Sequence, residues 1–539
     1  MAAFTILFLL SCSLFCSAAP ANASAITWIN CAEQPPFTLN TTSIDLTKLP
    51  STLHCGRVVV PMNYAKPIGP KNNITLGIAM YRPQNPKGVI FHNPGTTDEA
   101  TIFAWQAALN LSDVFGGLED YDLMMMDVRG TYNSNPLNVS LEIFQPLLGP
   151  FPTTQAEFDN FKNLSASAVQ SFIQLSTPPG ILQHVGTREI VQDYEIIRRS
   201  LGYEKINFVG SSGGSYKAAQ YATTFPKHVG NFVLDSVVPH GLSVNAQAQD
   251  MIVANNRALV RADAFCQNNA TCPFKSMGRG SVPKVSNSTF GRTKWLTEFV
   301  GKAFESIVTE ATSKPLPASL CVNSDKCVSP VTVSNIRQGL FYLLANTVDF
   351  PNVIEAIALG ASGDGSGFAL AAGDPIPDVT ATWAMSSVCN DYAFQKSLQA
   401  GSLKDPHKIR MTQGWEVLLW CSGWPFPTPP TASLPQFKAP IVLLTADFDV
   451  NSPTEWARSE WKKYPQGALI SRHGDDHVSW ILPHQPATKI AKTFLRTGKL
   501  PAPRNETQVA VYRPGMKLAP IPNPYNVGTG PIAGDIDSS

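Results

Sequence analysis

Short apolar runs alternate with helical patterns over much of this chain. The runs contain many β-branched, aromatic and other large apolar residues, which is the pattern of buried strands. Strands are predicted at 56–61, 73–82, 88–92, 122–127, 206–209, 231–238, 439–444 and 468–471. Helices are predicted at 194–201, 216–225, 455–463 and 486–497. Strands that alternate with helices in this way predict a mostly parallel sheet covered on both faces.

The alternation is lost between 239 and 435. Helical segments are interrupted there by Gly- and Ser-rich pieces such as 360–367. We interpret 239–435 as a mainly helical cap inserted into the sheet domain, and an independent second domain is the alternative. The sheet domain then consists of 22–238 and 436–499.

The two ends of the chain differ from the rest in composition. Residues 4–15 are an apolar run followed by small residues at 17–21, which is the pattern of a signal peptide over 1–21 with cleavage between Ala18 and Ala21. No later stretch is long and apolar enough for a transmembrane helix, so we expect secretion without a stable membrane anchor. Residues 500–539 are rich in Pro, Gly and Asn, which predicts an extended or disordered tail.

A Gly-x-Ser-x-Gly motif follows the strand predicted at 206–209 and reads Gly210-Ser211-Ser212-Gly213-Gly214. A strand before the motif and a helix after it are the context of a nucleophile elbow, where glycines permit the strained turn that presents the serine. Ser212 is therefore the candidate nucleophile. Ser211 and Ser215 are the alternatives, but they would place Val209 and Lys217 where the turn needs glycine.

Two later loops carry candidates for the acid and the histidine that activate a serine in this fold. The loop after the strand at 439–444 contains Asp447 and Asp449. The loop after the strand at 468–471 contains His473 and His477. The order serine, acid, histidine is the one the motif requires, but spacing alone does not choose within either pair.

Several motifs together are similar to those of the secreted tripeptidyl-aminopeptidase and prolyl-aminopeptidase group of α/β-hydrolases. The segment 55–67 resembles the family pattern "CG…VPLDY.NP", 93–97 resembles "NPGGPG" and 127–136 resembles "D.RG.G.S.P". Later in the chain, 421–425 resembles "C.GWP", 449–453 resembles "D..TP" and 476–477 resembles "GH". An acidic residue after a cysteine, also typical of the family, stands at 389–391. The resemblance covers roughly 55–140, 190–240 and 385–480 and implies an α/β-hydrolase fold.

The resemblance also assigns roles. It implies a catalytic triad of Ser212, Asp449 and His477, which leaves Asp447 and His473 as structural or solvated polar residues. A disulfide between Cys389 and Cys421 is implied under the cap. The backbone N–H of Gly213 and one from Gly95 or Thr96 are the expected oxyanion donors. Asp391 is the candidate for holding the free amine of a peptide substrate.

The sequence departs from the family around the oxyanion turn. The glycine-rich NPGGPG turn is replaced by NPGTTD, Gly213 stands where an aromatic residue usually follows the nucleophile, and Tyr132 stands where a glycine is expected. We therefore expect a serine aminopeptidase but keep two alternatives. One is a hydrolase of small-molecule or lipid-like carboxylic esters, and the other is a non-enzymatic binding protein on the same scaffold.

Composition excludes some other functions. Lys and Arg number 41 against 40 Asp and Glu, so the net charge is +1 and there is no basic field for nucleic acid. The glycines at 210–214 lack the spacing of a dinucleotide fingerprint, and no Cys/His cluster has the spacing of metal ligands. We expect no cofactor and no metal.

Cysteines and glycosylation sequons fit a secreted chain. After Cys12 and Cys16 leave with the signal peptide, eight cysteines remain, enough for four disulfides. Spacing predicts the pairs Cys31–Cys55, Cys266–Cys272 and Cys321–Cys327. Candidate N-glycosylation sites are Asn22, Asn40, Asn73, Asn110, Asn138, Asn163, Asn269, Asn287 and Asn505.

Overall fold

The computed structural model describes residues 26–148, 152, 154–274, 299–321, 327, 329–345, 348–372, 379–392, 419–428 and 439–529. Within these ranges eleven strands form one sheet in the order β1-β2-β3-β5-β4-β6-β7-β8-β9-β11-β10. The strands are β1 (Thr27–Ile29), β2 (Leu53–Val60), β3 (Ile74–Tyr81), β4 (Val89–Asn93), β5 (Asp122–Met126), β6 (Ile206–Ser211), β7 (Val229–Asp235), β8 (Ile441–Ala446), β9 (Gly467–Arg472), β10 (Arg504–Asn505) and β11 (Val509–Tyr512).

The middle of the sheet is parallel and its edges are antiparallel. Strands β5, β4, β6, β7, β8 and β9 pair in parallel, while β2, β3 and β11 join antiparallel. The predicted mostly parallel sheet is thus confirmed. Strand boundaries shift by a few residues, as for the strand predicted at 231–238, which is β7.

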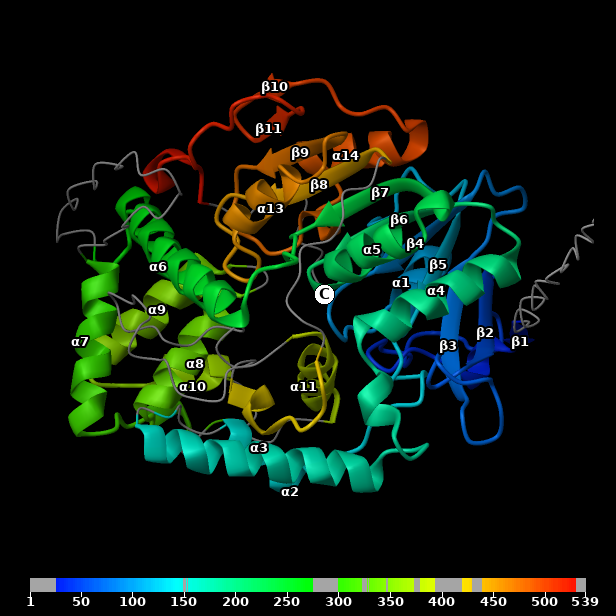
Figure 1. Cartoon of the computed structure of the whole chain (residues 1–539). Helices are drawn as coiled ribbons and strands as arrows, with labels where there is room; N and C mark the ends of the chain where they lie inside the picture. The colour runs from blue at the N-terminus through cyan, green and yellow to red at the C-terminus, as the bar shows by residue number, and fades with distance from the viewer. Residues whose placement is uncertain are drawn as a thin grey trace, which may run out of the picture.

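Helices cover both faces of the sheet (Figure 1). The helices α4 (Thr187–Leu201), α5 (Gly213–Thr224) and α13 (Thr454–Trp461) pack on one face, where Phe91 and Phe208 point. The helices α1 (Thr101–Leu109) and α14 (Pro486–Thr497) pack on the other face, against Ile90 and Val209. Neighbouring residues of one strand therefore enter two separate apolar cores, because side chains alternate across a sheet.

The cap helices lie between β7 and β8 in the chain. They are α6 (Val244–Asn268), α7 (Val300–Ser313), α8 (Val333–Leu344), α9 (Phe350–Ala361), α10 (Ser366–Ala372) and α11 (Val379–Asp391). Most of them share a core of their own, to which Phe304, Leu340 and Ile357 belong. The described residues between 239 and 435 are thus mainly helical.

A segment that precedes the nucleophile strand joins the cap helices. The helix α3 (Gln155–Leu175) packs on η8 (Cys421–Gly423) and on the short helix α2 (Leu141–Phe144), and in Figure 1 it runs below α8 and α10, away from the sheet. Ser165 of α3 donates to the carbonyl of Trp420 and accepts from the N–H of Gly423 at 3.1 Å.

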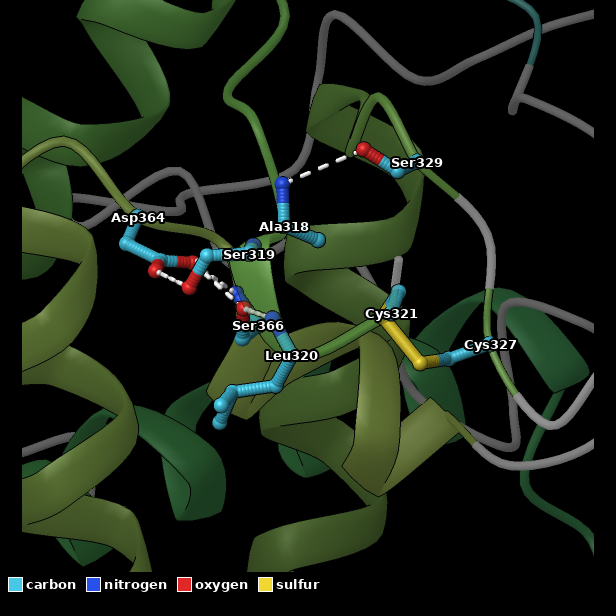
Figure 2. The surroundings of a disulfide bond; sticks show 8 residues. All are labelled: Ala318, Ser319, Leu320, Cys321, Cys327, Ser329, Asp364 and Ser366. Atoms are coloured by element: carbon cyan, nitrogen blue, oxygen red, sulfur yellow. Dashed lines mark hydrogen bonds between the residues drawn. A yellow bond between two sulfur atoms is a disulfide. The ribbon is translucent and has the colours of Figure 1, made fainter. Parts of the chain in front are cut away.

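Four disulfides form between the pairs of cysteines that the sequence and the family resemblance predict. Figure 2 shows the disulfide between Cys321 and Cys327 in the cap. Beside it the carboxylate of Asp364 accepts from the hydroxyls of Ser319 and Ser366, and the hydroxyl of Ser366 accepts from the N–H of Leu320 at 3.1 Å. The hydrogen bonds of Asp364 and Ser366 thus hold η6 (Ser319–Cys321) against the start of α10, and the disulfide ties the end of η6 to Cys327.

The prediction of an extended or disordered tail over 500–539 is wrong for its described part. Strand β11 pairs with β9 and extends the central sheet, β10 pairs with β11, and the turn η10 (Pro524–Asn526) packs on α6. The run Val509–Tyr512 is fully apolar and buried, so its β-branched residues outweigh the Pro and Gly around it.

Other sequence predictions concern the surface or fall outside the described ranges. No helix among the described residues is long and apolar enough to cross a membrane. The asparagines of seven sequons are described, and each is at least partly exposed: Asn40, Asn73, Asn110, Asn138, Asn163, Asn269 and Asn505. The predicted signal peptide over 1–21, Asn22 and Asn287 lie outside the described residues.

Candidate active site

The turn between β6 and α5 has the geometry of a nucleophile elbow. Ser212 adopts φ 52° and ψ −126°, a conformation that costs a non-glycine residue energy and needs support from its surroundings. A Cβ on Gly210 would lie 2.4 Å from the carbonyl oxygen of Gly214, and a Cβ on Gly214 would lie 2.1 Å from that of Asn93. The two glycines are therefore required by the close approach of β4, β6 and α5.

The alternative serines have other places. Ser215 donates to the carbonyl of Ser212 at 2.6 Å and accepts from the N–H of Val238 at 2.9 Å, so it ties the elbow to the segment after β7. The hydroxyl of Ser211 is fully buried and has no hydrogen-bond partner among the described residues. Of the three, it is Ser212 that lines a cavity of about 140 Å³ between the sheet and the cap.

Asp449 and His477 are brought together at the same end of the sheet. The Nδ1 atom of His477 lies 3.0 and 2.9 Å from the two carboxylate oxygens of Asp449. Asp449 also accepts from the hydroxyl of Ser236 at 2.9 Å and from the N–H groups of Asn451 and Ser452 at 2.8 and 2.9 Å. A carboxylate oriented by this many donors holds the proton of the imidazole on Nδ1, which leaves Nε2 as an acceptor.

The surroundings of His477 raise its pKa. Burial alone would lower the pKa, but the charge and the hydrogen bonds of Asp449 outweigh burial, and the charges of Asp235 and Asp98 add to the effect. Asp98 ends the NPGTTD segment, the turn that the family resemblance assigns to the oxyanion donors. The pKa of Asp98 is itself raised, chiefly by burial.

A second acid–histidine pair lies next to the first. The Nδ1 atom of His473 pairs with Asp447, whose other oxygen accepts from the hydroxyl of Ser471 at 2.7 Å. The N–H of His473 donates to the carbonyl of Gln508 just before β11. Asp447 and His473 thus tie the end of β9 to its neighbours, in keeping with a structural role.

Two of the three departures from the family motifs, the NPGTTD turn and Gly213, are coupled. A Cβ on Gly213 would lie 2.4 Å from the hydroxyl of Thr96, 2.8 Å from its Cα and 3.0 Å from its backbone nitrogen. No side chain fits at position 213 while the turn stays there, so an aromatic residue after Ser212 is excluded by Thr96. The close approach brings the backbone of Thr96 next to that of Gly213, where two N–H donors for an oxyanion are needed.

Sequence reasoning missed Lys217, which holds this arrangement. Its ammonium group is buried and donates to the carbonyls of Gly95, Thr96 and Gly213 at 3.3, 3.0 and 3.3 Å. Burial lowers the pKa of Lys217 to about 8, although the charges of Asp391 and Asp98 act against this. One lysine therefore fastens the oxyanion turn to the start of α5. In the sequence it looks like any exposed lysine of a helix, and only its distance of five positions from Ser212 could have drawn notice.

The cap supplies the opposite wall of the cavity. Val244 and Met251 of α6, Val388 of α11 and Trp420 make it largely apolar. Asp391 at the end of α11 is the one carboxylate among the described residues that line it. It accepts from the N–H and the hydroxyl of Thr187, both at 2.7 Å, and burial raises its pKa to about 6.

The described residues contain no group of three or more His, Cys, Asp or Glu side chains that could hold a metal ion. The chemistry open to this site is acid–base and nucleophilic catalysis by Ser212, His477 and Asp449, with backbone donors beside the serine.

Comparisons with known proteins agree with the fold. Residues 95–316 match the family model described as alpha/beta hydrolase fold, and 405–507 match the model described as TAP-like protein. Tripeptidyl aminopeptidase of Streptomyces lividans is 31% identical over 229 residues, which cover 41% of this chain and 40% of that protein. Serine protease Hip1 of Mycobacterium tuberculosis is 27% identical over 238 residues, which cover 42% of this chain and 44% of that protein. The match thus spans less than half the length of these curated relatives.

Among solved structures, proline iminopeptidase of Mycobacterium smegmatis aligns over 82% of this chain and 97% of that one, with 12% identity and a TM-score of 0.36. Sheet topology, elbow and family model agree on the fold: the chain has the α/β-hydrolase fold, and its elbow carries a serine. The chain is similar to the TAP-like family over 405–507, and the curated relatives named above are an aminopeptidase and a serine protease.

The pH dependence of hydrolysis follows from His477 and Lys217. On a short uncharged acyl ester, kcat/KM should rise with pH as His477 loses its proton, with a midpoint above the ordinary 6.5 because the pKa of His477 is raised. It should fall again around pH 8, where Lys217 loses the charge that fastens the oxyanion turn. A pH profile of kcat/KM from 5 to 10 tests both limbs.

The matched variant for this test is Lys217→Met. It should lower kcat by about 10- to 100-fold, because misplacing a catalytic group by about 1 Å can cost about 100-fold in rate. It should also abolish the alkaline limb. An alkaline limb that persists unchanged in Lys217→Met would show that another group causes it.

Proposed function

We propose that this chain is a secreted serine aminopeptidase that releases residues or short peptides from the amino end of peptide substrates. The observation that carries the proposal is that Ser212 and the half-buried carboxylate of Asp391 line the same cavity. A serine nucleophile explains hydrolysis, and a carboxylate in a largely apolar cavity is a binding site for the ammonium group of a peptide. The names of the curated relatives support the same activity.

In the proposed reaction Ser212 Oγ attacks the carbonyl carbon of the scissile bond while His477 Nε2 takes its proton. Asp449 stabilises the imidazolium that forms, and the N–H groups of Gly213 and Thr96 stabilise the oxyanion. His477 then gives the proton to the leaving nitrogen, and the C–N bond breaks to give an acyl-enzyme on Ser212. Water, deprotonated by His477, attacks the acyl carbon and the released serine oxygen recovers the proton.

Secretion is part of the proposal. Four disulfides, the predicted signal peptide and the exposed sequon asparagines support passage through an oxidising secretory pathway. Mass spectrometry of the protein from the culture medium of the native host would test this, through the mature amino terminus and the occupancy of the sequons. A protein retained inside cells with reduced cysteines would contradict it.

The first experiment is a substrate panel for the purified protein. It contains chromogenic peptides with a free amine, the same peptides with the amine blocked, and short acyl esters. Cleavage of the free-amine peptides, lost in Ser212→Ala, supports the aminopeptidase. Cleavage of esters alone would favour the ester hydrolase that the NPGTTD turn leaves open, and no turnover of any substrate would favour a binding protein.

Asp391→Asn tests the amine site. We expect KM for free-amine peptides to rise about 10- to 100-fold, since a hydrogen bond to a charged group contributes about 1.5–3 kcal/mol, while kcat/KM for esters stays within a few-fold. In the parent enzyme, KM for the same peptides should rise as pH falls through about 6, where Asp391 gains a proton. Steady-state kinetics on matched peptide and ester substrates measures both effects.

The control for this variant is Asp364→Asn. Asp364 is also a cap carboxylate bonded to serines, but it is not part of the cavity lining (Figure 2). It should change thermal stability and leave KM unchanged. Equal KM increases in the two variants, or an equal loss on esters in Asp391→Asn, would refute the amine role.

A further inference from the structure

A buried arginine connects the cap, the histidine loop and the C-terminal segment. Arg261 lies in the second half of α6, and its guanidinium is fully buried. Its Nε and Nη2 atoms donate to the two carboxylate oxygens of Asp475, both at 2.7 Å. The remaining donors bind backbone carbonyls of the chain end, namely Pro524, Val527 at 2.7 Å and Gly528 at 2.6 Å.

Both partners of this arginine in the sheet domain belong to the active-site loops. Asp475 lies two residues before His477. Arg261 also stacks over the ring of Phe448, 4.5 Å from its centroid, and Phe448 is the neighbour of Asp449. The N–H of Phe448 donates to the carbonyl of Gly474 at 3.1 Å, which links the acid loop with the histidine loop directly.

The C-terminal segment is built to hold the arginine in this place. Three carbonyls within five residues converge on one guanidinium, and the hydroxyl of Tyr525 pairs with Asp263 one half-turn further along α6. A buried guanidinium that loses three acceptors keeps unsatisfied donors, so it would move toward water and leave Asp475. The histidine loop would then lose its link to the cap.

We propose that residues 524–528 are a positioning element of the active site, which acts through Arg261 and Asp475 on His477. We call these residues the C-terminal strap. The inference builds on the assignment of His477 as the general base and concerns neither the substrate nor the bond cleaved. It predicts that a cleavage which removes the strap lowers activity although the strap touches no substrate. The exposed residues 514–517 just before it are accessible for such a cleavage.

The test compares chains that end at different positions. A chain of residues 1–517 lacks the strap, and a matched control of residues 1–529 keeps every acceptor of Arg261. With active sites counted by a fluorophosphonate probe, kcat on a short acyl ester should fall about 10- to 100-fold in 1–517 and stay unchanged in 1–529. A synthetic peptide of residues 518–529 should restore kcat in a saturable manner.

Two further readouts separate positioning from loss of stability. In 1–517 the acid limb of the kcat pH profile should move toward the ordinary histidine pKa, since His477 is no longer held against Asp449, and the peptide should reverse the move. In an Arg261→Met background, removal of the strap should have no additional effect on kcat, because both changes break the same contact.

Each outcome decides the proposal. Unchanged kcat and pH profile in 1–517, or additive effects with Arg261→Met, would overturn it. If 1–517 does not fold, the full-length Asp475→Asn variant takes its place and must show the same shift of the acid limb. An unshifted acid limb in Asp475→Asn would also overturn the proposal. The effect of the strap is measured as kcat on the ester, which does not depend on whether free-amine peptides are cleaved. Failure of the aminopeptidase assignment would therefore leave this test intact.

Discussion

Replacement of Ser212 by alanine is expected to lower kcat by about 10⁴- to 10⁶-fold on every substrate that the enzyme cleaves. The strained turn of the elbow exposes this hydroxyl in the cavity, beside the backbone of Gly213 and Thr96. Without the hydroxyl no acyl-enzyme forms, and only the backbone donors and substrate binding remain to stabilise a transition state. Single-turnover and steady-state kinetics on the substrate panel measure the loss.

The matched control for this change is Ser211→Ala. Its hydroxyl is one residue away but fully buried, with no partner among the described residues, so kcat should stay within a few-fold. Fluorophosphonate labelling should disappear in Ser212→Ala and persist in Ser211→Ala. Labelling that persists without Ser212 would assign the nucleophile to another residue.

Asp449→Asn is expected to reduce kcat by about 10⁴-fold. An asparagine can still accept from Ser452 and Asn451, but it cannot stabilise the imidazolium, and its amide group favours the wrong tautomer of His477. The raised pKa of His477 should fall at the same time, because the charge of Asp449 is the main cause that raises it. The acid limb of any residual activity would then move to lower pH.

The neighbouring acid–histidine pair provides the control. Asp447→Asn removes the same charge beside His473 and weakens the links from Asp447 to Ser471 and Arg458. It should lower the melting temperature and leave kcat per titrated active site within a few-fold. A loss as large as that of Asp449→Asn would show that the two pairs act together, or that their roles are exchanged.

The central strands and the elbow were predictable because the information is local. A β-branched run followed by Gly210-Ser211-Ser212-Gly213-Gly214 permits few conformations, and the structure shows the strand, the positive φ and the helix that the motif demands. The choice of Asp449 and His477 needed the family resemblance, since Asp447 and His473 have nearly the same spacing, 26 positions against 28. The structure pairs each histidine with one acid, a pattern that spacing alone could not reveal.

The features that the sequence did not reveal depend on distant parts of the chain. Lys217 and Arg261 read as exposed residues of helices, because nothing near them in sequence shows the carbonyls that bury them. The run Val509–Tyr512 carried a strand signal, but the Pro and Gly around it determined the interpretation. Helix α3 could be predicted as helical but not placed, since its partners Trp420 and Gly423 come more than two hundred residues later.

The position of α3 has a consequence for protein engineering. A self-contained insertion could be exchanged with that of a relative as a single segment, and the sequence predicts such an insertion at 239–435. In this protein the floor of that insertion is built from chain that precedes the nucleophile: Leu137 and Leu147 accept from the indoles of Trp383 and Trp420, and Thr187 anchors Asp391. A chimera must therefore carry 137–187 together with 239–435. Without 137–187, the transplanted indoles would lose the backbone carbonyls that accept their hydrogen bonds.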